Sequence, residues 1–174
     1  MSKDVSSQMG TESLLKPVLT VLSATLKPRG YVRSGSTVRL RNSDTVCIIS
    51  LQSSTSSISA LAKVTVNLGV HVPAFQGPER PEESPSTWST HWHQRIGHLL
   101  PAKDDVWWSI HTVEEGTSIA AEIVGCIERF GLPALAQVST LSALRQLWES
   151  GRSPGLTQAQ RVRFLQQLAE AEAQ

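Results

Sequence analysis

The segment 61–70 constrains the fold most, because its apolar side chains recur at every second position. Such alternation is typical of a β-strand that turns one face to the core and the other to more polar surroundings. The segment 45–52 (TVCIISLQ) is β-branched, and it is apolar on both parities in its middle. This composition predicts a central strand that is covered on both sides. The side chains predicted to face the core from the first segment are Ala62, Val64, Val66, Leu68 and Val70.

Shorter extended segments accompany these two. Residues 31–33 and 37–41 flank a turn at Ser34-Gly35-Ser36, and residues 106–111 (VWWSIH) predict a further strand. Helical patterns stand before and after this block of strands. The order predicts an α+β fold, in which an antiparallel sheet of four to five strands is packed by an N-terminal helix and by C-terminal helices.

The predicted helices carry recognisable start and stop signals. Leucine and valine recur at helical spacing over residues 11–27, and Pro17 interrupts this stripe, so the helix either begins near Lys16 or kinks there. Thr112 opens a capping box before the next long helix, which Gly131 is predicted to end.

Further capping residues predict two more helices near the end of the chain. Ser139 or Thr140 is predicted to cap one helix, Gly151 to close it, and Thr157 to cap a last one. The segment 87–100 (TWSTHWHQRIGHLL) predicts a short helix or a folded loop. The resulting organisation is a disordered lead at residues 1–10, an α+β domain at residues 11–150 and a C-terminal helical extension at residues 151–174.

The net charge and the hydropathy limit the kinds of partner that we expect for this protein. Sixteen Lys and Arg residues against fifteen Asp and Glu residues leave a net charge of +1, whereas a nucleic-acid binder usually carries a basic stripe. The polar N-terminus has no apolar segment of the kind found in signal peptides, and no window approaches the roughly 20 apolar residues of a membrane span. We therefore expect a cytoplasmic protein with no nucleic-acid partner and no membrane contact.

Cysteine usage agrees with a reducing compartment. Cys47 and Cys126 each stand among apolar residues, which predicts two core thiols and not a disulfide. No glycine-rich phosphate loop, dinucleotide fingerprint or Gly-x-Ser-x-Gly elbow is present. We therefore expect no cofactor, and no nucleophile stands out.

Three polar residues are candidates for binding: Gln52 and Asn67, at the ends or inner positions of the central strands, and Arg95, in the segment that follows them. Gln52, Asn67 and Arg95 would form a polar pocket on one sheet face, with Arg95 as an anchor for an anion and Trp107 beside it. The alternative is structural, because buried amides must find hydrogen-bond partners and a buried arginine needs an acid. That acid would be Asp104 or Asp105.

The segment from His71 to Pro101 gathers proline, tryptophan and histidine without a recognisable motif. Trp88 and Trp92 would share one face if the segment is helical, where they either cover the sheet or meet a partner. His91 and His93 are weak candidates for a metal site, since His-x-His on a strand places two imidazoles on one face. The alternative is a Trp- and His-rich surface loop that binds no metal.

The ordered segments LKPRGYVRSGSTVRLRN, ISLQSS, VTVNLGV, RIGHLL and DDVWW resemble the DUF 4304 family, a set of bacterial domains of unknown function. The resemblance covers about residues 12–148. The chain differs from the family pattern in having Tyr31 where Phe is commoner, and in an extended loop after Val70. The resemblance implies an α+β fold and no particular activity. The matching residues are Leu26, Gly30, Tyr31, Gln52, Ser53, Asn67, Leu68, Gly69, Arg95, Ile96, Gly97, Asp105, Trp107 and Trp108.

Two hypotheses for function follow from the sequence. The first is a non-enzymatic protein-binding module of the immunity or accessory type, which rests on analogy with other small bacterial domains that carry no catalytic constellation. It predicts an exposed aromatic patch near Trp88 and Trp92. The second is a small-molecule-binding or enzymatic domain, whose polar pocket would lie around Gln52, Asn67 and Arg95.

Overall fold

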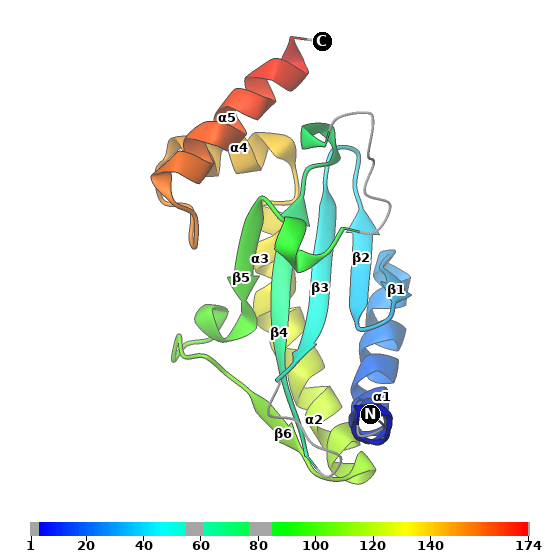
Figure 1. Ribbon diagram of the computed structural model, residues 1–174. Coiled ribbons are helices and arrows are strands. Elements are labelled where there is room, and N and C mark those ends of the chain that lie inside the picture. The colour runs from blue at the N-terminus through cyan, green and yellow to red at the C-terminus, as the bar shows by residue number, and fades with distance from the viewer. Residues whose placement is uncertain (1–3, 55–60, 77–84, 174) are drawn as a thin grey trace.

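The strands of the sheet are β1 (Val32–Ser34), β2 (Thr37–Arg41), β3 (Val46–Ser53), β4 (Ala62–His71), β5 (Trp92–Arg95) and β6 (Trp108–Ile110). The computed structural model describes residues 4–54, 61–76 and 85–173. Every strand pair is antiparallel, and the order is β1-β2-β3-β4-β5 (Figure 1). β5 pairs with residues 67–70 of β4 and β6 with residues 62–64, so both occupy the edge of β4 that β3 leaves free.

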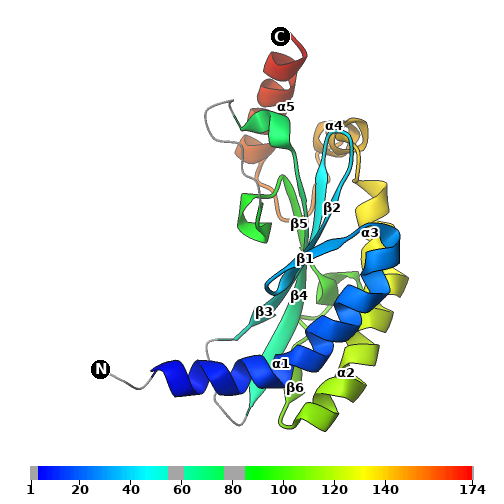
Figure 2. The same cartoon turned by 90° about the vertical axis from the view of Figure 1, so that its right-hand side faces the viewer.

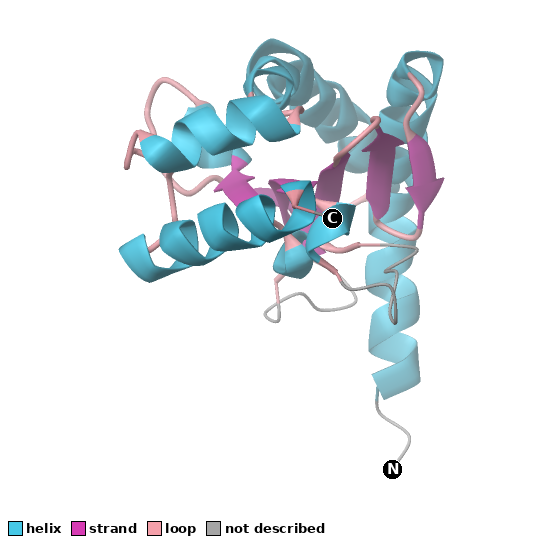
Figure 3. Cartoon of the chain, turned by 90° about the horizontal axis from the view of Figure 1, so that it is seen from above, coloured by secondary structure: helices cyan, strands magenta, loops and turns pink. Residues whose placement is uncertain are grey.

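The helices are α1 (Asp4–Leu26), α2 (Val113–Cys126), α3 (Leu132–Gln137), α4 (Leu141–Glu149) and α5 (Gln158–Glu172). Figure 2 shows α1, α2 and α3 on one side of the sheet. α4 and α5 pack against each other near the end of the sheet where β4 ends (Figures 1 and 3). Within the described part of the chain, no helix is long and apolar enough to span a lipid bilayer.

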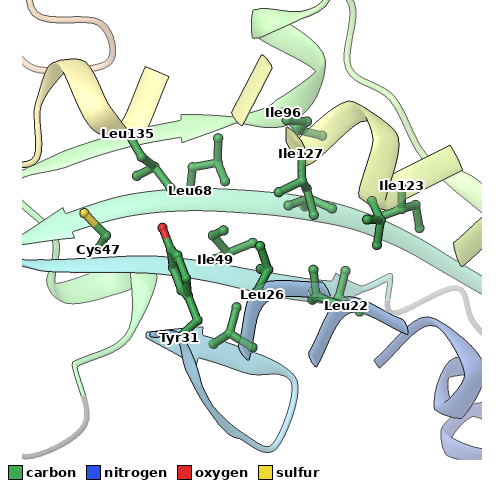
Figure 4. Packing of buried hydrophobic residues seen from close by; sticks show 14 of the residues in the cluster. Leu22, Leu26, Tyr31, Cys47, Ile49, Leu68, Ile96, Ile123, Ile127 and Leu135 are labelled. Atoms are coloured by element: carbon green, nitrogen blue, oxygen red, sulfur yellow. The ribbon is translucent and has the colours of Figure 1, made fainter. Parts of the chain in front are cut away.

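The core lies between the sheet and α1, α2 and α3. The predicted core-facing residues of β4, from Ala62 to Val70, are fully buried there, as expected. The opposite face of β4 is buried too, at Thr65, Asn67 and His71, because other segments cover it, so the burial does not alternate. Leu22, Ile123 and Ile127 from the helices meet this face (Figure 4). The α+β class, the antiparallel sheet and the packing of helices on it are therefore confirmed.

The first helix begins earlier than the sequence predicts. α1 starts at Asp4 and not at Thr11, so the predicted lead at residues 1–10 falls partly within the helix, and residues 1–3 lie outside the described residues. Pro17 lies inside α1, and the helix bends along its length in Figure 2. A proline ring displaces the preceding turn and removes one backbone donor, so of the two alternatives the kinked helix is correct.

Gly131 does not end the second long helix, so this prediction was wrong. The helix passes from α2 through a π-helical turn (Ile127–Gly131) directly into α3. Gly131 keeps helical dihedrals, and a Cβ atom there would lie 3.3 Å from Ile96 Cδ1 and 3.4 Å from Leu68 Cδ1. The glycine therefore serves close packing against the sheet.

The segment 87–100 contains a strand that the sequence does not reveal. It forms the 3₁₀ turns η3 (Thr87–Ser89) and η4 (Ile96–Leu99), with β5 between them. The backbone of β5 completes its hydrogen bonds on the free edge of β4, where Trp92 pairs with Val70 and is buried. A long-range pairing thus decides the structure of this segment.

Candidate functional site

Gln52, Asn67 and Arg95 lie on the sheet face opposite α1, α2 and α3, which we call the outer face. Asn67 pairs with Ser50 on one side and with Arg95 on the other, and paired residues of antiparallel strands project to the same face. Asn67 is buried, and its Nδ2 donates a hydrogen bond of 2.7 Å to Oε1 of Gln52. The three predicted residues are therefore neighbours across β3, β4 and β5.

Arg95, on the edge strand β5, forms an ion pair with Asp105. Its Nη1 lies 2.7 Å from Oδ2 of Asp105, and the same oxygen accepts a 2.9 Å hydrogen bond from Nε1 of Trp107. The guanidinium of Arg95 lies 5.3 Å from the centre of the Trp107 ring. The hydrogen bond from Arg95, and after it that from Trp107, holds the pKa of Asp105 below its ordinary value. Asp105, and not Asp104, is thus the acid that pairs with Arg95.

Residues 85–91 cross the outer face near the end of β4. Side chains of the sheet hold this segment in place through hydrogen bonds to its backbone carbonyls. Nε of Arg39 donates a 2.7 Å hydrogen bond to the carbonyl of Pro85, and Nδ1 of His71 donates one of 2.7 Å to the carbonyl of Ser89. A Cβ atom at Gly69 would lie 2.4 Å from Cγ2 of Thr90, so only glycine allows this close approach.

The anchored segment presents Trp88 to solvent. Its side chain is 84% exposed, the most exposed of the large apolar side chains in the described chain. A capping box between Ser86 and Ser89 fixes the turn that carries it. Trp92 is buried against β4, so the two tryptophans do not share a face, and the predicted patch near both of them reduces to Trp88.

The two histidines named as metal candidates have different environments. His93 is exposed on β5, whereas His91 lies half-buried and its Nδ1 accepts a 3.0 Å hydrogen bond from the backbone N–H of Val72. Burial, then the nearby His71 and Arg163, lowers the pKa of His91 to about 3. Among the described residues, no group of three or more His, Cys, Asp or Glu side chains is placed to hold a metal ion.

An aromatic junction, which sequence reasoning missed, joins α4 and α5 to the rest of the molecule. The His91 ring lies edge-on to Phe75 and Phe164, with 5.0 Å between ring centres in both cases, and Trp148 lies 5.4 Å from Phe164. His71 completes the group at 5.2 Å from His91. These residues come from separate segments and share no sequence pattern, so only the folded chain brings them together.

Both cysteines are free thiols. Cys47 is buried, as predicted for a core thiol, and burial raises its pKa above the ordinary value. Cys126 is only half-buried, and there too burial raises the pKa. A raised pKa keeps a thiol protonated and weakly nucleophilic at neutral pH.

These features define an α+β domain whose antiparallel sheet packs helices on its inner face and displays a row of polar and aromatic side chains on its outer face. The chain belongs to the family described as Domain of unknown function (DUF4304), whose match spans residues 22–137. The resemblance seen in the sequence is thereby confirmed. The match ends with α3, so α4 and α5 lie beyond it. No curated protein and no solved structure matches the chain.

The hydrogen bond between Asn67 and Gln52 leads to a first prediction. Asn67→Ala is expected to lower the free energy of unfolding by about 1–3 kcal/mol, because it leaves the half-buried acceptor of Gln52 without its donor. Ser109→Ala is the matched control, since Ser109 is exposed on the neighbouring strand β6 and should change stability by less than about 0.5 kcal/mol. Urea denaturation followed by circular dichroism measures both, and equal losses in the two variants would contradict the role of Asn67.

Proposed function

We propose that the protein is a cytoplasmic, non-enzymatic protein-binding module of the immunity or accessory type, which binds its partner with the outer face of the sheet. The observation that carries this proposal is Trp88, which is 84% exposed although the segment beneath it is anchored at Arg39 and His71. A tryptophan has only two side-chain torsions, and the backbone that carries Trp88 is anchored, so covering it with a partner costs little conformational entropy.

The neighbouring residues of the outer face agree with protein recognition. Arg95 and Trp107 form a partly exposed pair farther along the same face. Tryptophan and arginine are the residue types most enriched at the energetic centres of protein interfaces. Trp88 and this pair would together supply the aromatic and cationic contacts of such a centre.

The alternative, a small-molecule-binding or enzymatic domain, has less support from the same residues. Asn67 bonds to Gln52, and Arg95 bonds to Asp105. A ligand that used these groups would first have to break both interactions and would regain only what it replaced. The side chains proposed for the pocket therefore stabilise the strands and leave little hydrogen-bonding capacity for a ligand.

Affinity capture with two matched variants tests the proposal. The full-length protein is used as bait in a lysate of its host organism, alongside Trp88→Ala and Val32→Ala. Val32 is the control because it is 71% exposed on the edge strand β1. We expect a stoichiometric partner to be retained by the wild-type protein and by Val32→Ala. Binding of that partner should fall more than tenfold with Trp88→Ala, as for a residue at the centre of an interface.

Two results would oppose this function. The first is the recovery of no stoichiometric protein by the wild-type bait. The second is a partner that binds wild type and Trp88→Ala equally well, which would place the interface elsewhere on the molecule.

A further inference from the structure

A second candidate site lies on the opposite side of the sheet, where α3 passes the ends of the strands β2 and β3. A pocket of about 230 Å³ opens there. Its walls are formed by Leu40, Leu132, Leu135 and Ala136, and Tyr31 and Cys47 supply its polar atoms deeper in the protein. The pocket therefore has the composition of a small-molecule site, in which apolar walls surround a few placed polar groups.

The hydroxyl group of Tyr31 is the polar group of this pocket that can donate a hydrogen bond to a ligand. The residue is 93% buried, and no described residue forms a hydrogen bond with its hydroxyl. Figure 4 shows the ring directed from the residue before β1 toward Cys47 and Leu135, with the oxygen at its tip. The oxygen is not one of the fully buried atoms that lack a partner, so solvent reaches it through the pocket. A ligand in the pocket would replace that solvent and accept the hydrogen bond that the O–H donates.

The charges around the pocket favour a neutral ligand. Burial raises the pKa of Tyr31 and that of Cys47, so both groups keep their protons at neutral pH. Arg29, which also lines the pocket, already forms a 3.0 Å ion pair with Glu128. The amide of Asn42 is likewise occupied, by Thr45 and by the carbonyl of Ser139. No unpaired cation among the described lining residues is therefore available for an anion.

The volume of the pocket sets the size of the ligand. An apolar protein cavity of about 150 Å³ accommodates benzene, so a pocket of about 230 Å³ has room for one aromatic ring with a small substituent. We propose that this pocket binds a neutral, single-ring aromatic molecule that carries one oxygen acceptor, and that Tyr31 donates its O–H to that oxygen. The side chains of Leu40, Leu132 and Leu135 would cover the aromatic ring of the ligand.

A ligand-observed NMR titration of the full-length protein with acetophenone tests this site. Acetophenone has one aromatic ring and one uncharged carbonyl oxygen. We expect saturable binding that is about fivefold weaker in Tyr31→Phe, which corresponds to the loss of one hydrogen bond. Toluene has no acceptor, so its affinity should be the same for both proteins. Tyr31→Phe should fold as the wild type does, because its hydroxyl has no partner in the described part of the protein.

Two further comparisons complete the test. Benzoate has the size of acetophenone but carries a charge, and it should bind at least tenfold more weakly. Ala136→Trp places a large side chain at the exposed rim of the pocket and should abolish binding of acetophenone. Absence of saturable acetophenone binding to the wild type, or equal binding to wild type and Ala136→Trp, would overturn the proposal. Equal affinities for acetophenone and benzoate would overturn the assignment of a neutral ligand.

Discussion

Gly97→Ala is expected to lower the free energy of unfolding by about 3 kcal/mol, near the upper end of the usual cost of overpacking. A Cβ atom at this position would lie 2.1 Å from the carbonyl oxygen of Asp104 and 2.7 Å from the backbone nitrogen of Val106. Both obstacles are main-chain atoms, so no change of rotamer can relieve the contact. The loop from η4 back to β6 would have to move.

The control for this substitution is Gly125→Ala. A Cβ atom at Gly125 meets nothing within 4 Å, and the residue lies in α2, where alanine is a better helix former by roughly 1 kcal/mol. Chemical denaturation should therefore show opposite shifts of the midpoint for the two variants. A midpoint for Gly97→Ala equal to that of the wild type would show that the loop is not packed as described.

The same loop brings Asp105 and Trp107 against Arg95. Gly97→Ala should for this reason also displace the polar and aromatic row of the outer face. We expect the variant to bind a protein partner less well even at temperatures where it remains folded. The stability of this loop and recognition by the outer face thus depend on the same glycine.

Acid is expected to destabilise the protein through His91. The pKa of this residue is about 3 in the folded protein and 6.5 in the unfolded chain, so the unfolded chain takes up the proton first. Stability is therefore complete above pH 6.5 and is lost as the pH falls toward 3. Between pH 7 and pH 5 this one group should lower the free energy of unfolding by about 2 kcal/mol.

Denaturation of the wild type and His91→Gln at pH 7 and pH 5 isolates this contribution. Glutamine does not titrate, and its amide oxygen is an acceptor that replaces Nδ1 for the backbone N–H of Val72. His91→Gln should lose about 2 kcal/mol less than the wild type between the two pH values. His71 and Arg163, the charged or titratable neighbours that also lower the pKa of His91, are unchanged in the variant. Equal losses in both proteins would contradict the buried, neutral state of His91.

Sequence patterns were sufficient to predict those elements whose structure depends on residues close by in the chain. The alternation in residues 61–70 predicted β4 and the side chains that face the core, because the alternation of side chains is a property of the strand itself. It did not predict the burial of the opposite face, which distant segments cover. Thr112, Thr140 and Thr157 cap helices as predicted, since each cap needs only the next turn of the chain. β5 could not be predicted in this way, because it exists through its pairing with the distant edge of β4.

The same distinction between local and long-range interactions applies to the residues of the candidate site. The order of the strands was enough to predict that Gln52 and Asn67 come from neighbouring strands, whereas the place of Arg95 beside Asn67 follows from β5. Trp88 and Trp92 do not share a face because residues 92–95 form β5 and not a helix, and this strand buries Trp92 against β4. The aromatic junction involves α4 and α5 as well as η2 (Pro73–Phe75), and these contacts exist only in three dimensions.

The central claim, recognition of a protein by the outer face, is tested most directly by fluorine NMR of the protein labelled with 5-fluorotryptophan. Each of the five tryptophan resonances is assigned by a single Trp→Phe substitution. On addition of the protein captured by the wild-type bait, the resonances of Trp88 and Trp107 should shift, while that of the buried Trp148 should stay in place. Formation of the complex with Trp88 and Trp107 both unshifted would contradict the claim.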